Sequence, residues 1–320
     1  MKIGNWKEVI KIIEKHDNII IFHHIRPDGD CLGSQSGLAE LIKNNYSNKS
    51  VYIIGDNENN YNFLDFKFNN SIDINYENSL GIVVDVGNKE RIKNVEILLE
   101  DRITHRLRID HHPTNSDIKF DYEYIDSSFC AAAELITDLA IKSKWLINNN
   151  SAKYLYLGIN TDSGRFLYPG VKPRTFNCVA KLIKQANLDI FEIHNELYKK
   201  TLLDLRIQSH ILSNFKKDGK VLYYIATKKI QDLFNISSSD IGKYNNLLSN
   251  IEDNYIWLFF IEIDKNTYRV RLRSNGPKIN KIAMQFNGGG HAYASGATIY
   301  KKSDIKKIID MSNIEINKLK

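Results

Sequence analysis

The segment from Asn18 to Ser34, which reads NIIIFHHIRPDGDCLGS, restricts the fold more than any other part of the chain. Its four consecutive apolar residues, Ile19 to Phe22, are too few to span a membrane and are typical of a buried strand. Pro27 and Gly29 then favour a loop, and the residues from Cys31 onward have the apolar spacing of a helix. A buried strand that leads through a loop into a helix indicates an α/β protein.

Three polar side chains, His24, Asp28 and Asp30, lie in this loop with H-x-x-x-D-x-D spacing. Loops of this kind are where α/β sheets place their ligands. One imidazole and two carboxylates suit a hard or borderline divalent cation such as Mn²⁺ or Mg²⁺. The same residues also have an ordinary explanation, with Asp30 as a helix N-cap and Asp28 as a turn residue. This segment alone favours neither explanation.

The composition excludes several kinds of protein. The 320 residues are enough for two domains, and 44 Lys and Arg against 38 Asp and Glu give a net charge of +6. This charge suits an anionic ligand but is too small to indicate a long nucleic-acid track. The three cysteines include no C-x-x-C pair, so we expect a reducing cytoplasm and neither a disulfide framework nor a thiolate zinc site. The first 16 residues have the pattern of an amphipathic helix rather than a signal peptide, and no apolar run approaches a membrane span.

Strand and helix patterns alternate after the first segment. Strands are expected at residues 49–55, 80–86 and 106–110, and helices at 61–68, 134–144 and 151–160. Strands that alternate with helices predict a parallel sheet covered by helices on both faces.

A change in composition near residue 190 predicts a first domain over 1–190, a helical connector over 191–216 and a smaller α/β domain over 217–320. In the smaller domain we expect strands at 221–226, 255–263 and 268–274, a glycine-rich loop at 287–291 and a final helix at 304–319. Because side chains alternate between the two faces of a strand, Arg269, Arg271 and Arg273 should share one face.

Seven metal-binding or acid–base side chains lie at or just after the end of an expected strand or helix in the first domain: His24, Asp28, Asp30, Asp85, His111, His112 and Asp162. In a parallel sheet such ends gather at one edge, where four carboxylates would repel each other strongly. Two divalent cations would balance them, and two-metal sites suit phosphoryl chemistry. Each residue has an ordinary explanation by itself, for example Asp162 as a turn residue and His112 as a surface histidine, but their occurrence together does not.

The order of the motifs resembles one family. The matching segments are HIRPDGDCLGS at 24–34, VVDVGN at 83–88, IDHH at 109–112, GINTDSGRF at 158–166, RLRSNG at 271–276 and FNGGGHAYASGA at 286–297. Together they resemble the DHH phosphoesterases, in the DHH–DHHA1 branch that includes the NrnA-type nano-RNases. The DHH triplet alone would be a weak signal, whereas ordered motifs over nearly the whole chain are highly specific. The resemblance implies an active site in the cleft between a parallel-sheet DHH domain and a smaller DHHA1 domain.

The resemblance also implies roles for individual residues. It assigns one metal ion, expected to be Mn²⁺ with Mg²⁺ as an alternative, to His24, Asp28 and Asp85. It assigns a second ion to Asp30, His111 and Asp162, with Asp85 bridging the two. The implied catalytic residues are Asp85, Asp110 and His112, where Asp110 orients a neighbouring histidine and His112 stabilises the transition state or protonates the leaving oxygen. The implied substrate-binding residues are Arg273, Ser274, Gly288, Gly289, Gly290 and His291.

The resemblance implies hydrolysis of short single-stranded RNA or DNA oligonucleotides to mononucleotides, and of the nucleoside bisphosphate 3′-phosphoadenosine-5′-phosphate (pAp) to AMP. The alternatives are a phosphodiesterase for cyclic di-AMP or its linear product pApA, and a catalytically silent nucleotide-binding regulator. A manganese pyrophosphatase ranks lower because it lacks the glycine-rich loop. We expect no membrane partner, and a homodimer is a further expectation.

Two positions depart from the pattern of this family. Cys31 stands where a small apolar residue is usual, and its thiol either makes the site sensitive to oxidation or simply packs inside a helix. Gly87, in the segment Asp85-Val86-Gly87-Asn88, leaves the local rigidity of this segment open.

Overall fold

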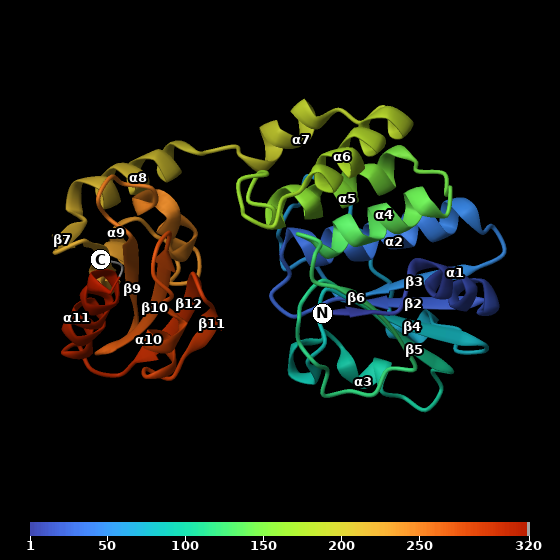
Figure 1. The fold of residues 1–320 in the computed structure, drawn as a ribbon, viewed down its shortest axis with the longest axis horizontal. Coiled ribbons are helices and arrows are strands. Elements are labelled where there is room, and N and C mark those ends of the chain that lie inside the picture. Colours follow the sequence, from blue (N-terminus) through green and yellow to red (C-terminus); the bar gives the residue numbers. More distant parts are fainter. Residues whose placement is uncertain (319–320) are drawn as a thin grey trace. The chain divides into compact units, whose positions relative to one another are not determined.

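The computed structural model describes residues 1–318 of the chain. Two compact units divide the chain, Met1–Lys199 and Lys200–Lys320, and each is a mixed α/β structure with its own six-stranded sheet (Figure 1). The expected α/β fold class is therefore confirmed. Within residues 1–318, no helix combines the length and the apolar character needed to cross a lipid bilayer.

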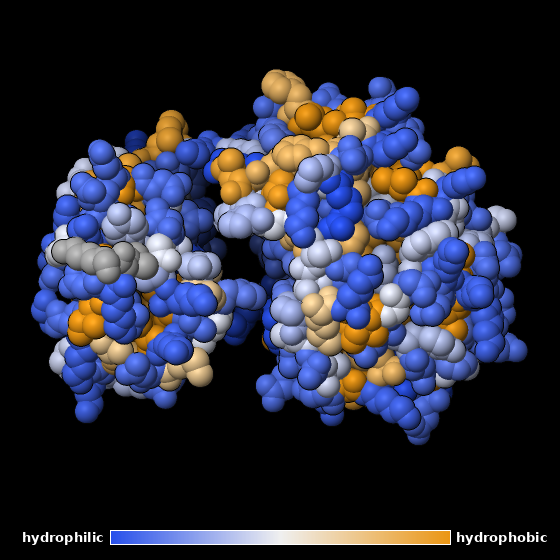
Figure 2. All heavy atoms as spheres, viewed as in Figure 1, coloured by the Kyte–Doolittle hydropathy of each residue, from blue (hydrophilic) through white to orange (hydrophobic). Residues whose placement is uncertain are grey.

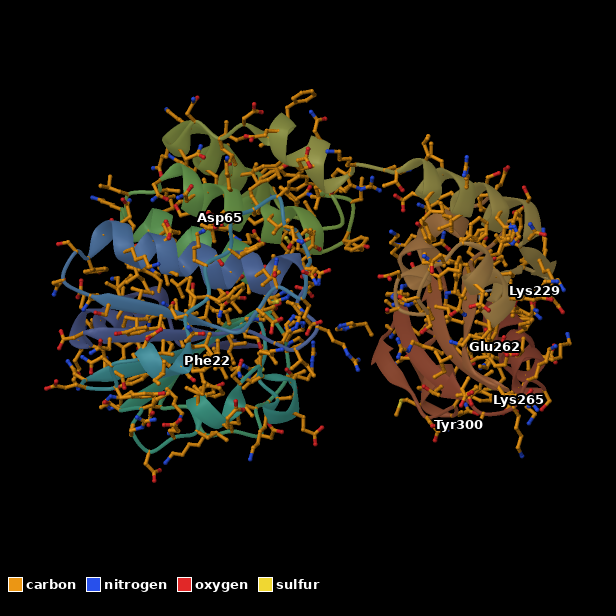
Figure 3. All side chains as sticks on the ribbon, turned by 180° about the vertical axis from the view of Figure 1, so that it is seen from behind. Phe22, Asp65, Lys229, Glu262, Lys265 and Tyr300 are labelled. Atoms are coloured by element: carbon orange, nitrogen blue, oxygen red, sulfur yellow. The ribbon has the colours of Figure 1, made fainter. Side chains whose placement is uncertain are left out.

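The sheet of the first unit has the strand order β1-β6-β5-β4-β2-β3. Its strands are β1 (Lys2–Ile3), β2 (Asn18–Phe22), β3 (Ser50–Ile54), β4 (Ser79–Val84), β5 (His105–Asp110) and β6 (Tyr122–Asp126). Five of them are parallel, as predicted, and β1 adds an antiparallel edge beside β6. Strand β2, which ends at Phe22 (Figure 3), lies between β4 and β3, and all five of its side chains are buried.

Helices cover the two faces of this sheet unequally. Side chains of Ile19 and Ile21 pack with the helices of one face, whereas Ile20 and Phe22 pack on the other. The helices α1 (Trp6–Lys15), α2 (Gly29–Asn45) and α4 (Ala132–Lys142) lie against the first face. Beyond them lie α5 (Asn149–Asp162), α6 (Pro173–Ala186) and α7 (Ile190–Leu197), which belong to the same hydrophobic core (Figure 1). The second carries only the short helix α3 (Val95–Leu98) and loops that include the 3-10 turns η1 (Ser71–Asp73) and η2 (Lys89–Arg91). The prediction of helices on both faces was therefore wrong for most of the second face.

Two local predictions in the first unit were also wrong. Residues 61–68 form turns and irregular structure instead of a helix, and Tyr61 has a φ of +55°, which a right-handed helix does not allow. The N-terminal helix begins only at Trp6, because residues 2–3 pair with β6. A two-residue strand is too short to leave a periodic signal in the sequence.

The second unit has the strand order β11-β12-β10-β9-β8-β7, in which only β8 and β9 are parallel. Its strands are β7 (Lys216–Asp218), β8 (Val221–Ala226), β9 (Ile256–Asp264), β10 (Thr267–Ser274), β11 (Gly289–His291) and β12 (Ala294–Ile299). Its helices are α8 (Leu202–Asn214), α9 (Lys228–Leu233), the 3-10 helix η3 (Ile241–Leu248), α10 (Asn280–Met284) and α11 (Asp304–Asn317). The predicted end of the last helix, Leu319, lies outside the described residues. The predicted hairpin of β9 and β10 is present, with Lys265 at its turn (Figure 3).

Arginine and apolar side chains alternate between the two faces of β10, as predicted. Val270 and Leu272 are fully buried in the core, whereas Arg269, Arg271 and Arg273 lie on the opposite face and are partly or fully exposed. The glycine-rich segment was expected to be a loop, but Gly289–His291 form β11 and pair with β12. Pairing with β12 therefore gives this glycine-rich segment a regular conformation.

Candidate metal centre and active site

The predicted metal ligands of the first unit meet at one edge of the parallel sheet. His24 follows β2, Asp85 follows β4, His111 follows β5, and Asp162 is the last residue of α5. The carboxyl ends of parallel strands share one edge, so residues far apart in the sequence come together there. Asp85 has a φ of +61°, an unfavourable value for a residue with a side chain, which is often found at functional sites.

One group of donor atoms surrounds His24. Its Nε2 lies 3.5 Å from Oδ2 of Asp28 and 3.6 Å from Oδ2 of Asp85. The other oxygen of Asp28 is already used, because Oδ1 accepts hydrogen bonds from the backbone N–H groups of Asp30 and Cys31 at the start of α2. Asp28 therefore caps the helix with one oxygen and presents the other to the site.

A second group of donor atoms surrounds His111. Its Nε2 lies 3.4 Å from Oδ1 of Asp85, 3.3 Å from Oδ2 of Asp162 and 3.8 Å from Oδ2 of Asp30. Asp85 thus presents one oxygen to each group, which is the arrangement expected of a bridging carboxylate.

The separations between donor atoms fit divalent cations. Two adjacent ligands, each about 2.1 Å from an octahedral cation, lie about 3 Å apart. The separations of 3.3–3.8 Å are close to this value and long for direct hydrogen bonds. Oδ1 of Asp85 is buried and has no hydrogen-bond partner, which is costly unless another group satisfies it. Within residues 1–318, three groups of side chains could each hold a metal ion: His24, Asp28 and Cys31; Asp85, His111 and His112; and Asp30, His111 and Asp162.

Cys31 belongs to the first group by position, but its chemistry does not suit a hard cation. Burial raises the pKa of the Cys31 thiol to about 12, so the sulfur keeps its proton. Sγ lies 3.6 Å from the backbone oxygen of Asp28, to which it donates. Imidazole nitrogen and carboxylate oxygen are the better ligands for Mn²⁺ or Mg²⁺.

Asp30 has a structural role that its position in the sequence did not indicate. Its carboxylate accepts hydrogen bonds from the backbone N–H groups of Ala132 and Ala133, at 2.6 and 2.9 Å. These residues begin α4, whose own N-cap, Ala131, has no side chain that can accept a hydrogen bond. Asp30 is therefore not the N-cap of its own helix, a role that Asp28 fills, but caps a helix about a hundred residues away while facing His111.

Electrostatics in the site favour binding of cations. Burial raises the pKa of Asp30, and the neighbouring Asp85 and Asp162 raise it further. Burial also raises the pKa of Asp162, to about 6. Burial alone would lower the pKa values of His24 and His111, but the carboxylates around them outweigh it and raise both. Without metal, protons on these histidines balance the carboxylates, so a metal ion would have to replace protons.

His112 lies beside the second group and is held by Asp110. Oδ1 of Asp110 accepts hydrogen bonds from Nδ1 and from the backbone N–H of His112, at 2.8 and 2.9 Å. Nδ1 of His112 is also 3.5 Å from Oδ1 of Asp85. The other oxygen of Asp110 is bound by Arg108, a residue that the sequence analysis missed; its i, i+2 spacing to Asp110 along β5 was the only signal.

The predicted substrate-binding residues gather in the second unit. Arg273 of β10 and His291 of β11 both lie opposite Ala294 of the intervening strand β12. Gly288 is needed for packing, because a Cβ there would lie 2.1 Å from the backbone oxygen of Gly296. Gly290 has a φ of +128°, which favours glycine, and Ser274 accepts a hydrogen bond from the backbone N–H of Gly276. Around Gly289, in contrast, the space is open.

Comparisons with known proteins agree with these motifs. Residues 18–159 match the DHH family, N-terminal domain, and residues 218–318 match the DHHA1 domain. A Mycoplasma genitalium protein named bifunctional oligoribonuclease and PAP phosphatase NrnA is 43% identical, over 97% of this chain and 97% of its own length. The Mycoplasma pneumoniae protein of the same name is 41% identical, over 96% and 95%.

A solved structure supports the fold. An exopolyphosphatase-related protein from Bacteroides fragilis superposes with a TM-score of 0.83, covering 98% of this chain and 96% of its own, at 24% sequence identity. The family models cover most of the chain and the relatives cover nearly all of it. The chain therefore belongs to the DHH phosphoesterase family, as a protein in which a DHH domain is followed by a DHHA1 domain.

Proposed function

We propose that this protein hydrolyses very short single-stranded oligonucleotides to mononucleotides and pAp to AMP. The observation that carries the proposal is Asp85, whose two oxygens face His24 and His111 from opposite sides of one carboxylate. The names of the Mycoplasma relatives support the choice of substrates. The proposed domain organisation is a catalytic domain over 1–190, a connector over 191–216 and a substrate-binding domain over 217–320.

Two divalent cations, Mn²⁺ in the first place, complete the proposed centre. His24 and Asp28 would hold one ion, Asp30, His111 and Asp162 would hold the other, and Asp85 would bridge both. When bound, such ions neutralise phosphate oxygens and lower the pKa of a water molecule that attacks phosphorus.

His112 is the proposed proton donor. Because Asp110 holds Nδ1 of His112, we assign the contact with the substrate to Nε2. From Nε2 a proton would pass to the leaving oxygen, or its positive charge would stabilise the transition state. Arg273 and the backbone around Gly288–Gly290 would bind a phosphate, Ser274 would assist, and His291 would stack on a base.

A hydrolysis panel in Mn²⁺ tests the function. The substrates are a dinucleotide, a long single strand, pAp, cyclic di-AMP, pApA and pyrophosphate, assayed side by side. We expect the highest kcat/KM on the dinucleotide and clear turnover of pAp. Preference for cyclic di-AMP or pApA would replace the proposal with the cyclic-dinucleotide alternative, and no turnover of any substrate would favour a silent nucleotide-binding regulator.

We also propose that the chain forms a homodimer. Large apolar side chains are exposed on and beside α6 and α7, where Figure 2 shows hydrophobic residues gathered: Leu167, Phe176, Ile183, Ile190 and Phe191. Leu167 and Phe191 are 75% and 72% exposed, and exposed apolar side chains gathered in one region often mark an interface. Light scattering of the wild type and of Phe176→Glu checks this: the wild type should have twice the mass of the variant, and a monomeric wild type would contradict it.

A further inference from the structure

A fully buried arginine lies directly behind the proposed proton donor. Arg108 is the largest fully buried side chain among the described residues, and its guanidinium lies inside the first unit next to the end of β5. Its Nε and Nη2 donate to the same oxygen, Oδ2 of Asp110, at 3.1 and 2.5 Å. Buried arginine is costly unless its charge and its N–H groups are satisfied. Asp110, which is also fully buried, provides most of this compensation.

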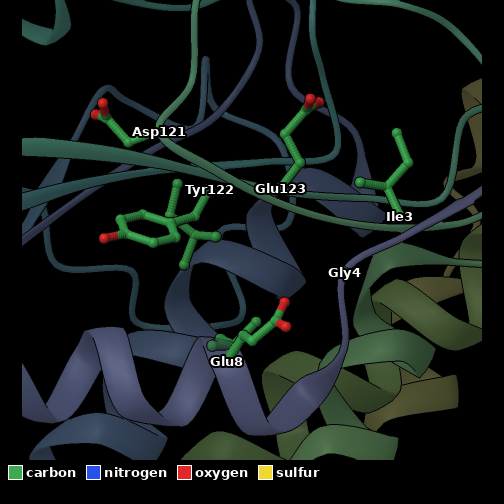
Figure 4. Close-up of a pocket in the computed structure, with 8 residues that line it drawn as sticks. Ile3, Gly4, Glu8, Asp121, Tyr122 and Glu123 are labelled. Atoms are coloured by element: carbon green, nitrogen blue, oxygen red, sulfur yellow. The ribbon is translucent and has the colours of Figure 1, made fainter.

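The remaining contacts of Arg108 come from weaker partners. Nη1 donates to the backbone oxygen of Thr114 at 3.0 Å and lies 3.5 Å from Oε2 of Glu123. Glu123 is partly exposed and also lines a cavity of about 230 Å³ together with Glu8 and Asp121 (Figure 4). The solvent around Glu123 screens its charge, so Asp110 is the main counter-ion of Arg108.

Asp110 is therefore held from two sides. Arg108 binds Oδ2, and His112 donates to Oδ1 through both Nδ1 and its backbone N–H. A carboxylate bound at both oxygens cannot rotate, so the direction of the His112 ring depends on where Arg108 holds Asp110. Mutation of a group that orients a site residue in this way typically costs about tenfold to hundredfold in activity.

Gly87 leaves the space in which the guanidinium lies. A Cβ at position 87 would be 2.3 Å from Cζ of Arg108 and 2.5 Å from Nη2, closer than any real contact. Gly87 does not have a positive φ, so its backbone conformation does not require glycine. The contact with Arg108 explains this glycine, and it couples the segment after β4 to the end of β5.

We propose that Arg108 and Gly87 form a pair of positioning residues: Arg108, lying against Gly87, fixes the carboxylate of Asp110, which in turn fixes His112 for catalysis. This inference rests on the proposed function, in which His112 acts on the substrate. Among residues 1–318, the hydrogen-bond partners of the Arg108 side chain are Asp110, Thr114 and Glu123, none of which is a proposed metal ligand, so we expect the pair to act on kcat rather than on metal binding.

The test compares Arg108→Lys, Gly87→Ala and His112→Ala with two double variants, Arg108→Lys with Gly87→Ala and Arg108→Lys with His112→Ala. Lysine keeps the buried positive charge, so the fold should survive, but it cannot bind one oxygen through two N–H groups. Arg106→Lys is the matched control, since Arg106 lies on the same face of β5 and its side chain donates to the backbone oxygens of Leu98 and Glu100. Circular dichroism and metal content establish that each variant is folded and loaded.

We expect Arg108→Lys and Gly87→Ala each to lower kcat on a dinucleotide roughly tenfold to hundredfold, with KM nearly unchanged and two metal equivalents still bound. Adding Arg108→Lys to His112→Ala should cause little further loss, because residues that act through one another are not additive. The fold loss of kcat in the double variant of Gly87→Ala and Arg108→Lys should likewise be smaller than the product of the two single fold losses. Arg106→Lys should keep the wild-type kcat.

Two outcomes would overturn the proposal. One is wild-type kcat in Arg108→Lys and Gly87→Ala, which would make the pair structural; the other is a full multiplicative loss when Arg108→Lys is added to His112→Ala. A separate readout does not depend on turnover: with ¹⁵N-labelled histidine, the Nδ1–H signal of His112 should exchange slowly with solvent in the wild type and rapidly in both single variants. If the wild type fails to hydrolyse the dinucleotide, the proposed function fails, and this exchange measurement alone still supports or overturns the positioning role.

Discussion

Replacing Asp85 by asparagine should abolish the stabilisation that metal ions at both proposed sites give to the first unit. Asp85 presents Oδ2 to His24 at 3.6 Å and Oδ1 to His111 at 3.4 Å, so one carboxylate serves both groups. Asp162 faces only His111 among these histidines, at 3.3 Å. Asparagine keeps the size of the side chain but loses its charge and one acceptor. Asp85→Asn should therefore weaken both sites, and Asp162→Asn should weaken one.

The size of the effect follows from binding linkage. A ligand present at a hundredfold excess over its Kd stabilises the folded state by about 2.7 kcal/mol, so two filled sites together give roughly 5 kcal/mol. For a unit the size of Met1–Lys199, 1 kcal/mol corresponds to a shift in Tm of about 2–4 °C. Wild-type protein should thus gain roughly 10–20 °C on addition of Mn²⁺. Asp162→Asn should gain about half as much and Asp85→Asn close to nothing.

Calorimetry measures this shift in Tm, with each variant compared with its own metal-free form. Metal analysis of the dialysed protein gives the number of ions bound. Asp138→Asn is a suitable control, since Asp138 is also nearly buried but pairs with Lys142 on α4 at 2.5 Å, apart from the site. The control should keep the full rise in Tm on addition of Mn²⁺. Two bound equivalents in Asp85→Asn, or equal shifts in Asp85→Asn and Asp162→Asn, would refute the bridging role.

Three further predictions concern pH and substrate. Burial raises the pKa of Asp162 to about 6, above the value of about 3.9 in an unfolded chain, so the folded state binds the proton more tightly and metal-free protein should lose stability as pH rises from about 4 to 6. Urea unfolding in EDTA should therefore show Asp162→Asn gaining stability relative to wild type at pH 7 but not at pH 4; equal differences at both pH values would contradict this. Arg273→Ala should lose a charge-assisted contact of roughly 1.5–3 kcal/mol, about tenfold to hundredfold in kcat/KM on a dinucleotide, and His291→Ala a similar or smaller amount, with little effect on bis-p-nitrophenyl phosphate. Equal losses on both substrates would assign these residues to structure or chemistry instead of recognition. Finally, kcat/KM should fall from a dinucleotide to a long single strand, and comparable values would speak against a site for short substrates.

Family membership was open to prediction from the sequence because it depends on local signals. Pro27 interrupts regular structure after an apolar run, and the ordered motifs around His24, Asp85 and His111 lie at the ends of strands. The alternation around Val270 and Leu272 likewise follows from the period of a strand. Each of these features is contained within a window of a few residues, where side-chain period and turn chemistry act directly.

Contacts between distant residues decided the rest. No local pattern shows that Asp30 caps the helix beginning at Ala132, that the two-residue strand β1 pairs with β6, or that residues 61–68 form turns. The sequence by itself determined which chemical groups reach the sheet edge, because strand ends and loops are encoded locally. Only the tertiary structure decided how they face one another: the two oxygens of Asp85 point to different histidines, and Arg108 lies in the space left by Gly87, because strands β4 and β5 pair side by side.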